Sequence, residues 1–196
     1  MFTAATVTSD ENFSMDLGRN LGEALHRRLG QTPHACWLFC APKQGLQDLL
    51  NGVNDAAGTA NIVGCTADGE MSAAGYCKGS AVLGGIVSDQ IDFTIAYADN
   101  LSQHCELPGR QLADKLSPAV QYVQLFSDGI TGNGCGILRG ILSVFGEDLP
   151  IAGGTAEAAL LPGLSTLSSD LVIQEIMLWD LRSRGVQVLS TDPEDL

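Results

Sequence analysis

Strand-length apolar runs alternate with helix-length amphipathic stretches along most of this 196-residue sequence. In the longer stretches the apolar residues recur every three or four positions and form one stripe of a helix. The shorter runs are continuously apolar, as in strands that are buried on both faces. The predicted helices cover residues 14–30, 45–57, 108–118 and 131–145, and the predicted strands cover residues 3–7, 35–40, 62–65, 120–126 and 149–152.

Two further strands are predicted over residues 80–87 and 91–97. They are separated by Ser88-Asp89-Gln90, which is the length of a tight hairpin loop. Together with the alternation of strands and helices, this pattern predicts an α/β fold. We expect a mixed β-sheet with flanking helices, an α–β sandwich, that contains an inserted antiparallel hairpin.

The pattern weakens after Gly154. Residues 171–181 are apolar enough for a helix or a strand, and apolar content alone does not distinguish the two. Residues 190–196 are polar and are expected to be loosely held. No internal repeat is predicted.

The chain is strongly acidic, with 10 Lys and Arg residues against 23 Asp and Glu residues and a formal net charge of −13. Such a surface repels nucleic acid and anionic lipid, so neither is an expected partner. The first residues lack the pattern of a signal peptide, and no run approaches the roughly 20 apolar residues of a membrane-spanning helix. We therefore expect a soluble, cytoplasmic protein.

The six cysteines form no Cys-x-x-Cys pair, and most of them lie in apolar runs. Cys36 and Cys40 are about 13 Å apart on one predicted strand, too far for a disulfide or a shared zinc ion. Three consecutive side chains diverge, so His104-Cys105-Glu106 is not expected to hold a metal. We interpret most of the thiols as small apolar core residues in a reducing compartment, and we expect no metal.

Three segments share one design, in which an apolar strand runs into a polar loop interrupted by glycines. They cover residues 62–70, 123–134 and 150–157. Parallel strands of an α/β sheet deliver such loops to one edge, where ligands bind. The candidate ligand-binding residues are Cys65, Thr66, Asp68, Glu70, Ser127, Asp128, Thr131, Asn133, Gly153, Gly154 and Thr155.

The residues of these loops favour a small zwitterionic or neutral metabolite. The second loop leads into a predicted helix, whose first amides attract an anion, but it lacks the lysine of a phosphate-binding loop. The carboxylates Asp68, Glu70 and Asp128 would repel a phosphate and attract an amine. Cys65 and Ser127 have no histidine base nearby in the sequence, so we expect no catalytic residues. A hydrolase or transferase that uses Cys65 or the carboxylates is the enzymatic alternative.

The ordered motifs resemble those of the FIST N-terminal domain. Residues 64–71 read Gly-Cys-Thr-Ala-Asp-Gly-Glu-Met, and they are followed by Gly75-Tyr76 and an apolar run. Residues 125–129 read Leu-Phe-Ser-Asp-Gly, and residues 149–154 read Leu-Pro-Ile-Ala-Gly-Gly. The resemblance implies a sensory domain of intracellular signal transduction that binds small ligands such as amino acids. It divides the chain into a sensory domain over residues 1–157 and a C-terminal extension over residues 158–196.

The resemblance also implies two alternatives. Some relatives are haem-containing nitric oxide sensors, and the candidate axial ligands here are His26, His34 and His104. Haem is therefore a possible cofactor, although the sequence itself indicates none. The family is usually coupled to a FIST C-terminal domain or to a signalling partner. The second alternative is an interaction module that such a domain, or a second copy of the chain in a homo-oligomer, completes.

Overall fold

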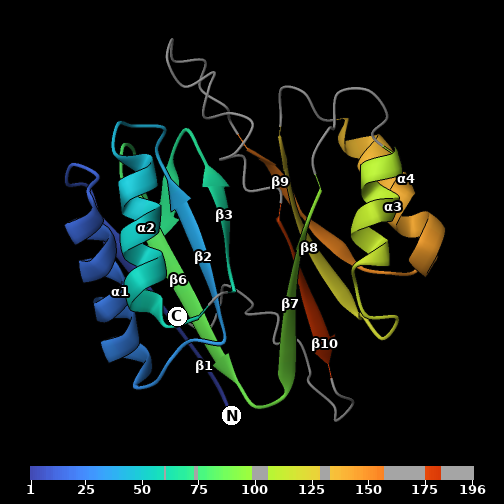
Figure 1. Cartoon of the computed structure of the whole chain (residues 1–196), viewed down its shortest axis with the longest axis horizontal. Helices are drawn as coiled ribbons and strands as arrows, with labels where there is room; N and C mark the ends of the chain where they lie inside the picture. Colours follow the sequence, from blue (N-terminus) through green and yellow to red (C-terminus); the bar gives the residue numbers. More distant parts are fainter. Residues whose placement is uncertain (60, 73–74, 99–105, 129–132, 157–174, 182–196) are drawn as a thin grey trace, which may run out of the picture.

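Two four-stranded sheets face each other, and a pair of helices covers the outer face of each (Figure 1). This computed structural model describes residues 1–59, 61–72, 75–98, 106–128, 133–156 and 175–181. Mixed sheets with flanking helices confirm the predicted α/β fold. Among the described residues, no helix has the length and apolar character needed to cross a membrane.

The first sheet has the strand order β1-β6-β2-β3. Strands β2 and β3 are parallel, and β6 is antiparallel to both of its neighbours, β1 and β2. A short antiparallel pair, β4 and β5, is inserted between β3 and β6. The elements are β1 (Phe2–Ser9), α1 (Met15–Leu29), β2 (Ala35–Cys40), α2 (Leu46–Ala57), β3 (Ile62–Thr66), β4 (Glu70–Ser72), β5 (Gly75–Cys77) and β6 (Ala81–Ser88).

The second sheet has the strand order β7-β10-β8-β9. Strands β8 and β9 are parallel, and β10 is antiparallel to both β7 and β8. Part of the ambiguous stretch 171–181 is therefore a strand at the centre of this sheet. The elements are β7 (Ile91–Tyr97), α3 (Glu106–Asp114), β8 (Tyr122–Asp128), α4 (Gly134–Phe145), β9 (Ile151–Ala156) and β10 (Glu175–Leu181).

The prediction that residues 80–87 and 91–97 form a hairpin is wrong. Strand β6 pairs with β1 and β2 in the first sheet, whereas β7 pairs with β10 in the second. The short connection between them crosses from one sheet to the other at the lower end of the molecule (Figure 1). The inserted antiparallel hairpin of the fold is instead β4–β5, which follows the Gly-Cys-Thr segment.

The two halves of the chain repeat one topology, which corrects the prediction of no internal repeat. Each half runs β-α-β-α-β, and a later antiparallel strand then enters the sheet between the first and second strands. Gly64 lies opposite Leu38 in the parallel pair of the first half, and Gly153 lies opposite Leu125 in the second. The sequences around these glycines also match, because residues 62–67 read Ile-Val-Gly-Cys-Thr-Ala and residues 151–156 read Ile-Ala-Gly-Gly-Thr-Ala.

Paired glycines bring the two helices of each half into close contact. A Cβ atom on Gly18 or Gly52 would clash with a carbonyl oxygen of the other helix, α2 or α1. Gly109 and Gly140 have the same relation between α3 and α4. Both helix pairs therefore approach at backbone distance, which seats their apolar stripes on the sheets.

The continuous apolar character of the strands follows from the layered arrangement. In β2, Leu38 and Cys40 belong to the cluster that includes the leucines of α1 and α2. Trp37 and Phe39 point the other way, into the core between the sheets. There the ring of Phe39 meets that of Phe126 edge to face, with the ring centroids 5.4 Å apart. Period-two alternation places each set of side chains in a different core.

We predict that Gly52→Ala lowers the free energy of unfolding by about 2 kcal/mol, because the new methyl group clashes with the carbonyl oxygen of Met15. In an unconstrained helix the same change would stabilise the protein by roughly 0.5–1 kcal/mol. Urea unfolding measures the difference. The control is Gly134→Ala, where the described structure places no atom within 4 Å of the new carbon. Equal stability of Gly52→Ala and wild type would contradict the helix spacing.

Candidate functional site

The carboxyl ends of β3, β8 and β9 lie at the same end of the molecule, which is the upper end in Figure 1. The contact between the sheets extends to these ends. Cys65, the fourth residue of β3, packs against the cluster that contains Phe126 of β8. The first and second predicted loops therefore leave from strands whose side chains share one cluster, and β9 runs beside β8 in parallel.

Cys65 and Thr66 are half-buried at the end of β3. Burial raises the pKa of the Cys65 thiol to about 11. The neighbouring Cys40 is buried as well, and its burial, with a smaller contribution from Glu70, raises its pKa to about 12. Both thiols are therefore protonated at neutral pH and are poor nucleophiles.

Glu70 is buried, with only 2% of its surface exposed, and it connects the β4–β5 pair to the first sheet. Its Oε2 atom accepts hydrogen bonds from the backbone N–H of Ser80, at 3.1 Å, and from the Ser80 hydroxyl, at 2.7 Å. These bonds tie β4 to the residue that precedes β6. The other oxygen, Oε1, is buried and has no hydrogen-bond partner among the described residues.

Asp68 is exposed and forms an ion pair with Lys78, at 3.1 Å. The hydrogen bond to Asp68 raises the pKa of Lys78 above its usual value. Lys78 was not predicted from the sequence, because it follows the short β5 strand and not a candidate loop. This lysine reduces the negative charge that the three predicted carboxylates would bring to the site.

The second predicted loop is described only in part. Ser127 is buried within β8, and Asp128 is the last residue of that strand. Asn133 caps helix α4, where its Oδ1 atom accepts a hydrogen bond from the backbone N–H of Gly136, at 3.4 Å. Thr131 and the side chain of Asp128 lie outside the described part of the chain.

Gly153, Gly154 and Thr155 lie in strand β9 and not in the loop predicted after it. Gly153 has a positive φ of 150°, and a Cβ atom there would clash with the backbone of Leu125. The glycine thus permits close strand pairing, although the sequence analysis interpreted it as the start of a loop. Gly154 and Thr155 are exposed on this edge strand.

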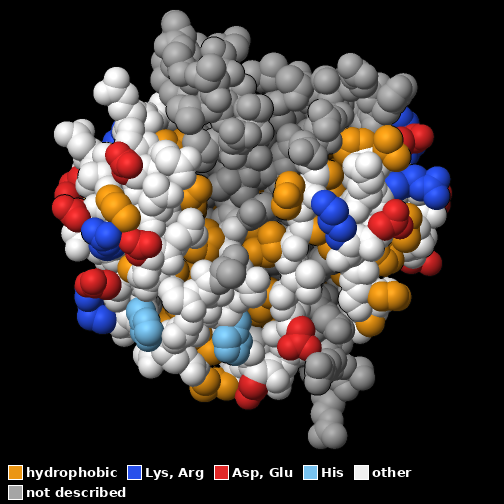
Figure 2. All heavy atoms as spheres, viewed as in Figure 1, with side chains coloured by type: hydrophobic (Ala, Val, Ile, Leu, Met, Phe, Trp, Pro, Cys, Tyr) orange, Lys and Arg blue, Asp and Glu red, His pale blue; other side chains and the backbone are white. Residues whose placement is uncertain are grey.

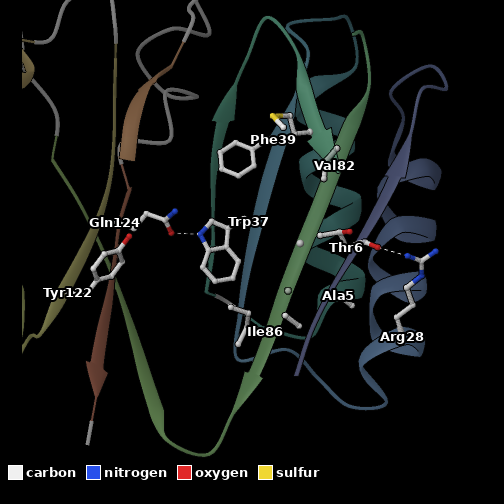
Figure 3. A pocket seen from close by; sticks show the side chains of 13 residues that line it. Ala5, Thr6, Arg28, Trp37, Phe39, Val82, Ile86, Tyr122 and Gln124 are labelled. Atoms are coloured by element: carbon white, nitrogen blue, oxygen red, sulfur yellow. Dashed lines mark hydrogen bonds between the residues drawn. The ribbon is translucent and has the colours of Figure 1, made fainter. Parts of the chain in front are cut away.

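A cavity lies between the two sheets, and it was not predicted from the sequence (Figure 3). We call it the inter-sheet groove. Its volume is about 640 Å³. One wall is the inner face of β1, β6 and β2, and the other includes Tyr122 and Gln124 of β8. The indole N–H of Trp37 crosses between the sheets to donate a hydrogen bond to Gln124 Oε1, at 2.6 Å. Met71 lines the groove too, directly after Glu70 in the chain.

The described histidines do not fit a haem site, either at the ends of β3, β8 and β9 or in the inter-sheet groove. His26 is exposed on α1. His34 accepts a hydrogen bond on Nδ1 from the backbone N–H of Ser88, and it precedes β2 at the opposite end from the three strand ends. Neither residue lines the inter-sheet groove, and His104 lies outside the described residues. Within the described residues there is also no group of three ligands that could hold a metal ion.

In a comparison with protein families, the model of the FIST N domain matches residues 34–173. The match includes β2, β3, β8 and β9, and with them all three predicted loops. It also extends past residue 157, where the recognised motifs end. A search of curated proteins gives no match.

We predict that Cys65 resists alkylation at neutral pH. Raising the thiol pKa from 9.0 to about 11 lowers the thiolate fraction about a hundredfold, and the reaction rate rises with pH up to that value. Iodoacetamide labelling followed by peptide mass mapping should modify the exposed Cys135 first. Rapid modification of Cys65 at pH 7.5 would instead indicate an activated nucleophile.

We also predict that Glu70→Ala lowers the free energy of unfolding by about 3 kcal/mol, because it removes two charge-assisted hydrogen bonds from a buried site. Ser80→Ala removes one of them and should cost about 1 kcal/mol. Urea unfolding measures both changes. Asp68→Ala, which removes an exposed carboxylate from the same segment, serves as the control and should leave the stability unchanged.

Proposed function

The chain belongs to the FIST N domain family of sensory domains in signal transduction, and we propose that it binds an amino acid or a similar small metabolite at the ends of β3, β8 and β9. The observation that carries the proposal is the position of these three ends at one end of the molecule. The repeat supports it, because β3 and β9 present equivalent Gly-x-Thr-Ala segments there. Parallel strands commonly hold ligands at their carboxyl ends.

The charges at these strand ends suit a molecule that carries both an amine and a carboxylate. Asp68 and Asp128 provide negative charge for an amine. Helix α4 begins at Gly134, just after the second loop, and its first backbone amides favour a carboxylate. Glu70 serves a structural role through Ser80, so we assign the amine to the two aspartates.

The proposed response is a shift between two arrangements of the halves. Each half has its own helix-covered core, and the inter-sheet cluster joins them. A ligand that contacts both β3 and β9 would favour the arrangement in which these ends are closest. It shifts the equilibrium only by the difference in its affinity for the two arrangements. The changed arrangement would be recognised by a signalling partner, a FIST C-type domain or a second copy of the chain. We propose no catalysis by this domain.

We predict that one of the twenty amino acids, in a thermal-shift screen, raises the melting temperature by roughly 5–10 °C at a concentration a hundredfold above its Kd. Asp128→Asn and Thr155→Val should each weaken binding about tenfold in calorimetry, because they remove polar groups at the strand ends. The control Asp16→Asn removes a charge from the outer face of α1 and should bind normally. The proposal fails if no amino acid stabilises the protein, or if both variants bind it as wild type does.

A further inference from the structure

The inter-sheet groove exists because the two repeats differ at equivalent positions. Thr6, Gly84 and Trp37 stand in one row across β1, β6 and β2. The register of the second sheet makes Ile95 of β7 the equivalent of Thr6, and Gln124 of β8 the equivalent of Trp37. In this row, Thr6 therefore corresponds to the larger Ile95, and Gly84 of β6 corresponds to Met177 of β10.

The next row shows the same difference. Ala4 of β1 corresponds to Phe93 of β7. Phe93 and Ile95 pack into the inter-sheet core, whereas Ala4 and Thr6 line the groove. The second half thus fills its part of the interface with side chains, and the first half leaves a cavity.

The backbone does not require glycine at position 84. A Cβ atom there would make only ordinary contacts, the nearest being Thr6 Cγ2 at 3.7 Å. By contrast, a Cβ atom on Gly85, which faces the helices, would clash with Leu25. Gly84 therefore contributes open space to the groove and no special backbone conformation.

The lining of the groove combines aromatic surface with hydrogen-bond donors. Trp37 and Tyr122 line it from opposite sheets (Figure 3). The indole N–H of Trp37 donates a hydrogen bond to the amide oxygen of Gln124. Arg28 stands at the outer rim, where its guanidinium donates to the Thr6 carbonyl. No acidic residue is among the described residues that line the groove, although the chain carries a net charge of −13. Hydrophobic side chains are visible between the two halves in Figure 2.

We propose that the inter-sheet groove binds an aromatic carboxylate. The flat ring lies over Gly84 and against the Trp37 indole, and the carboxylate meets Arg28. Two strand spacings separate β2 from β1, so a molecule about 10 Å long spans the distance from the indole to the rim. A volume of about 640 Å³ is typical of small-molecule sites. This site is separate from the strand-end site and does not depend on the proposed function.

The test uses 2-naphthoate as the probe and 2-naphthamide as its neutral counterpart, both titrated into the full chain by calorimetry. We expect one naphthoate to bind per chain. Thr6→Ile and Gly84→Met copy Ile95 and Met177, the residues at the equivalent positions of the second repeat. Each should weaken binding at least tenfold, because it fills the groove. Arg28→Gln should weaken naphthoate about fivefold and leave naphthamide unchanged.

Thr8→Ile is the matched control. Thr8 lies two residues after Thr6 on β1, on the same face, and is not among the groove-lining residues. It should bind naphthoate normally. Circular dichroism and thermal unfolding show whether each variant is folded, and Thr6→Ile tests the groove if Gly84→Met does not fold.

Three results would overturn the proposal. The first is a folded wild type that does not bind naphthoate at millimolar concentration, as expected if a second copy or another polypeptide segment fills the groove. The second is unchanged binding in the folded Thr6→Ile variant. The third is equal affinity for naphthoate and naphthamide, because the groove would then select a ring and not an anion. Loss of the amino-acid response with naphthoate binding intact would refute only the strand-end site.

Discussion

The contact between the inner faces of the two sheets is the interaction on which the rest of the structure depends. Phe39 meets Phe126, and Trp37 meets Gln124, and in each pair the two residues occupy equivalent positions of the repeat. Equivalent positions that touch each other indicate an approximate two-fold relation between the halves. This relation brings the ends of β3 and β9 to the same end of the molecule.

The repeat separates residues that serve the fold from residues that can serve binding. Glycines stand at equivalent positions where the parallel strands approach closely, as Gly64 and Gly153 do. On the inner face the halves differ in size, as Thr6 and Ile95 show. Close backbone packing tolerates no Cβ atom, whereas an open interface tolerates either a large side chain or a ligand. The groove thus results from differences in side-chain size between equivalent positions of the two repeats.

Local periodicity predicted most of the helices and strands, but it could not predict how strands pair. The short connection at Ser88-Asp89-Gln90 suits a hairpin, and only the separate inner-face packing of β7 reveals that the chain changes sheets there. The predicted strand ended at residue 152, before Gly153, because glycine is typical of loops; β9 in fact continues to Ala156. Glu70 was expected at an open site, since carboxylates are rarely buried, and its partner Ser80 lies ten residues away. The groove could not be predicted from the sequence, because it arises from small residues on two strands, β1 and β6, that are far apart in the chain.

The proposed strand-end site and the proposed groove lie on the same interface, and this limits how the domain can respond. Met71 lines the groove and follows Glu70, whose hydrogen bonds to Ser80 anchor the segment that continues from β3. Phe39 lines the groove and also contacts Phe126 beneath the strand ends. A ligand at either proposed site would touch residues of both halves. Since each half has its own helix-covered core, the relative position of the halves is the variable that we propose both ligands change. Two chemically different ligands would therefore both change the relative position of the two halves.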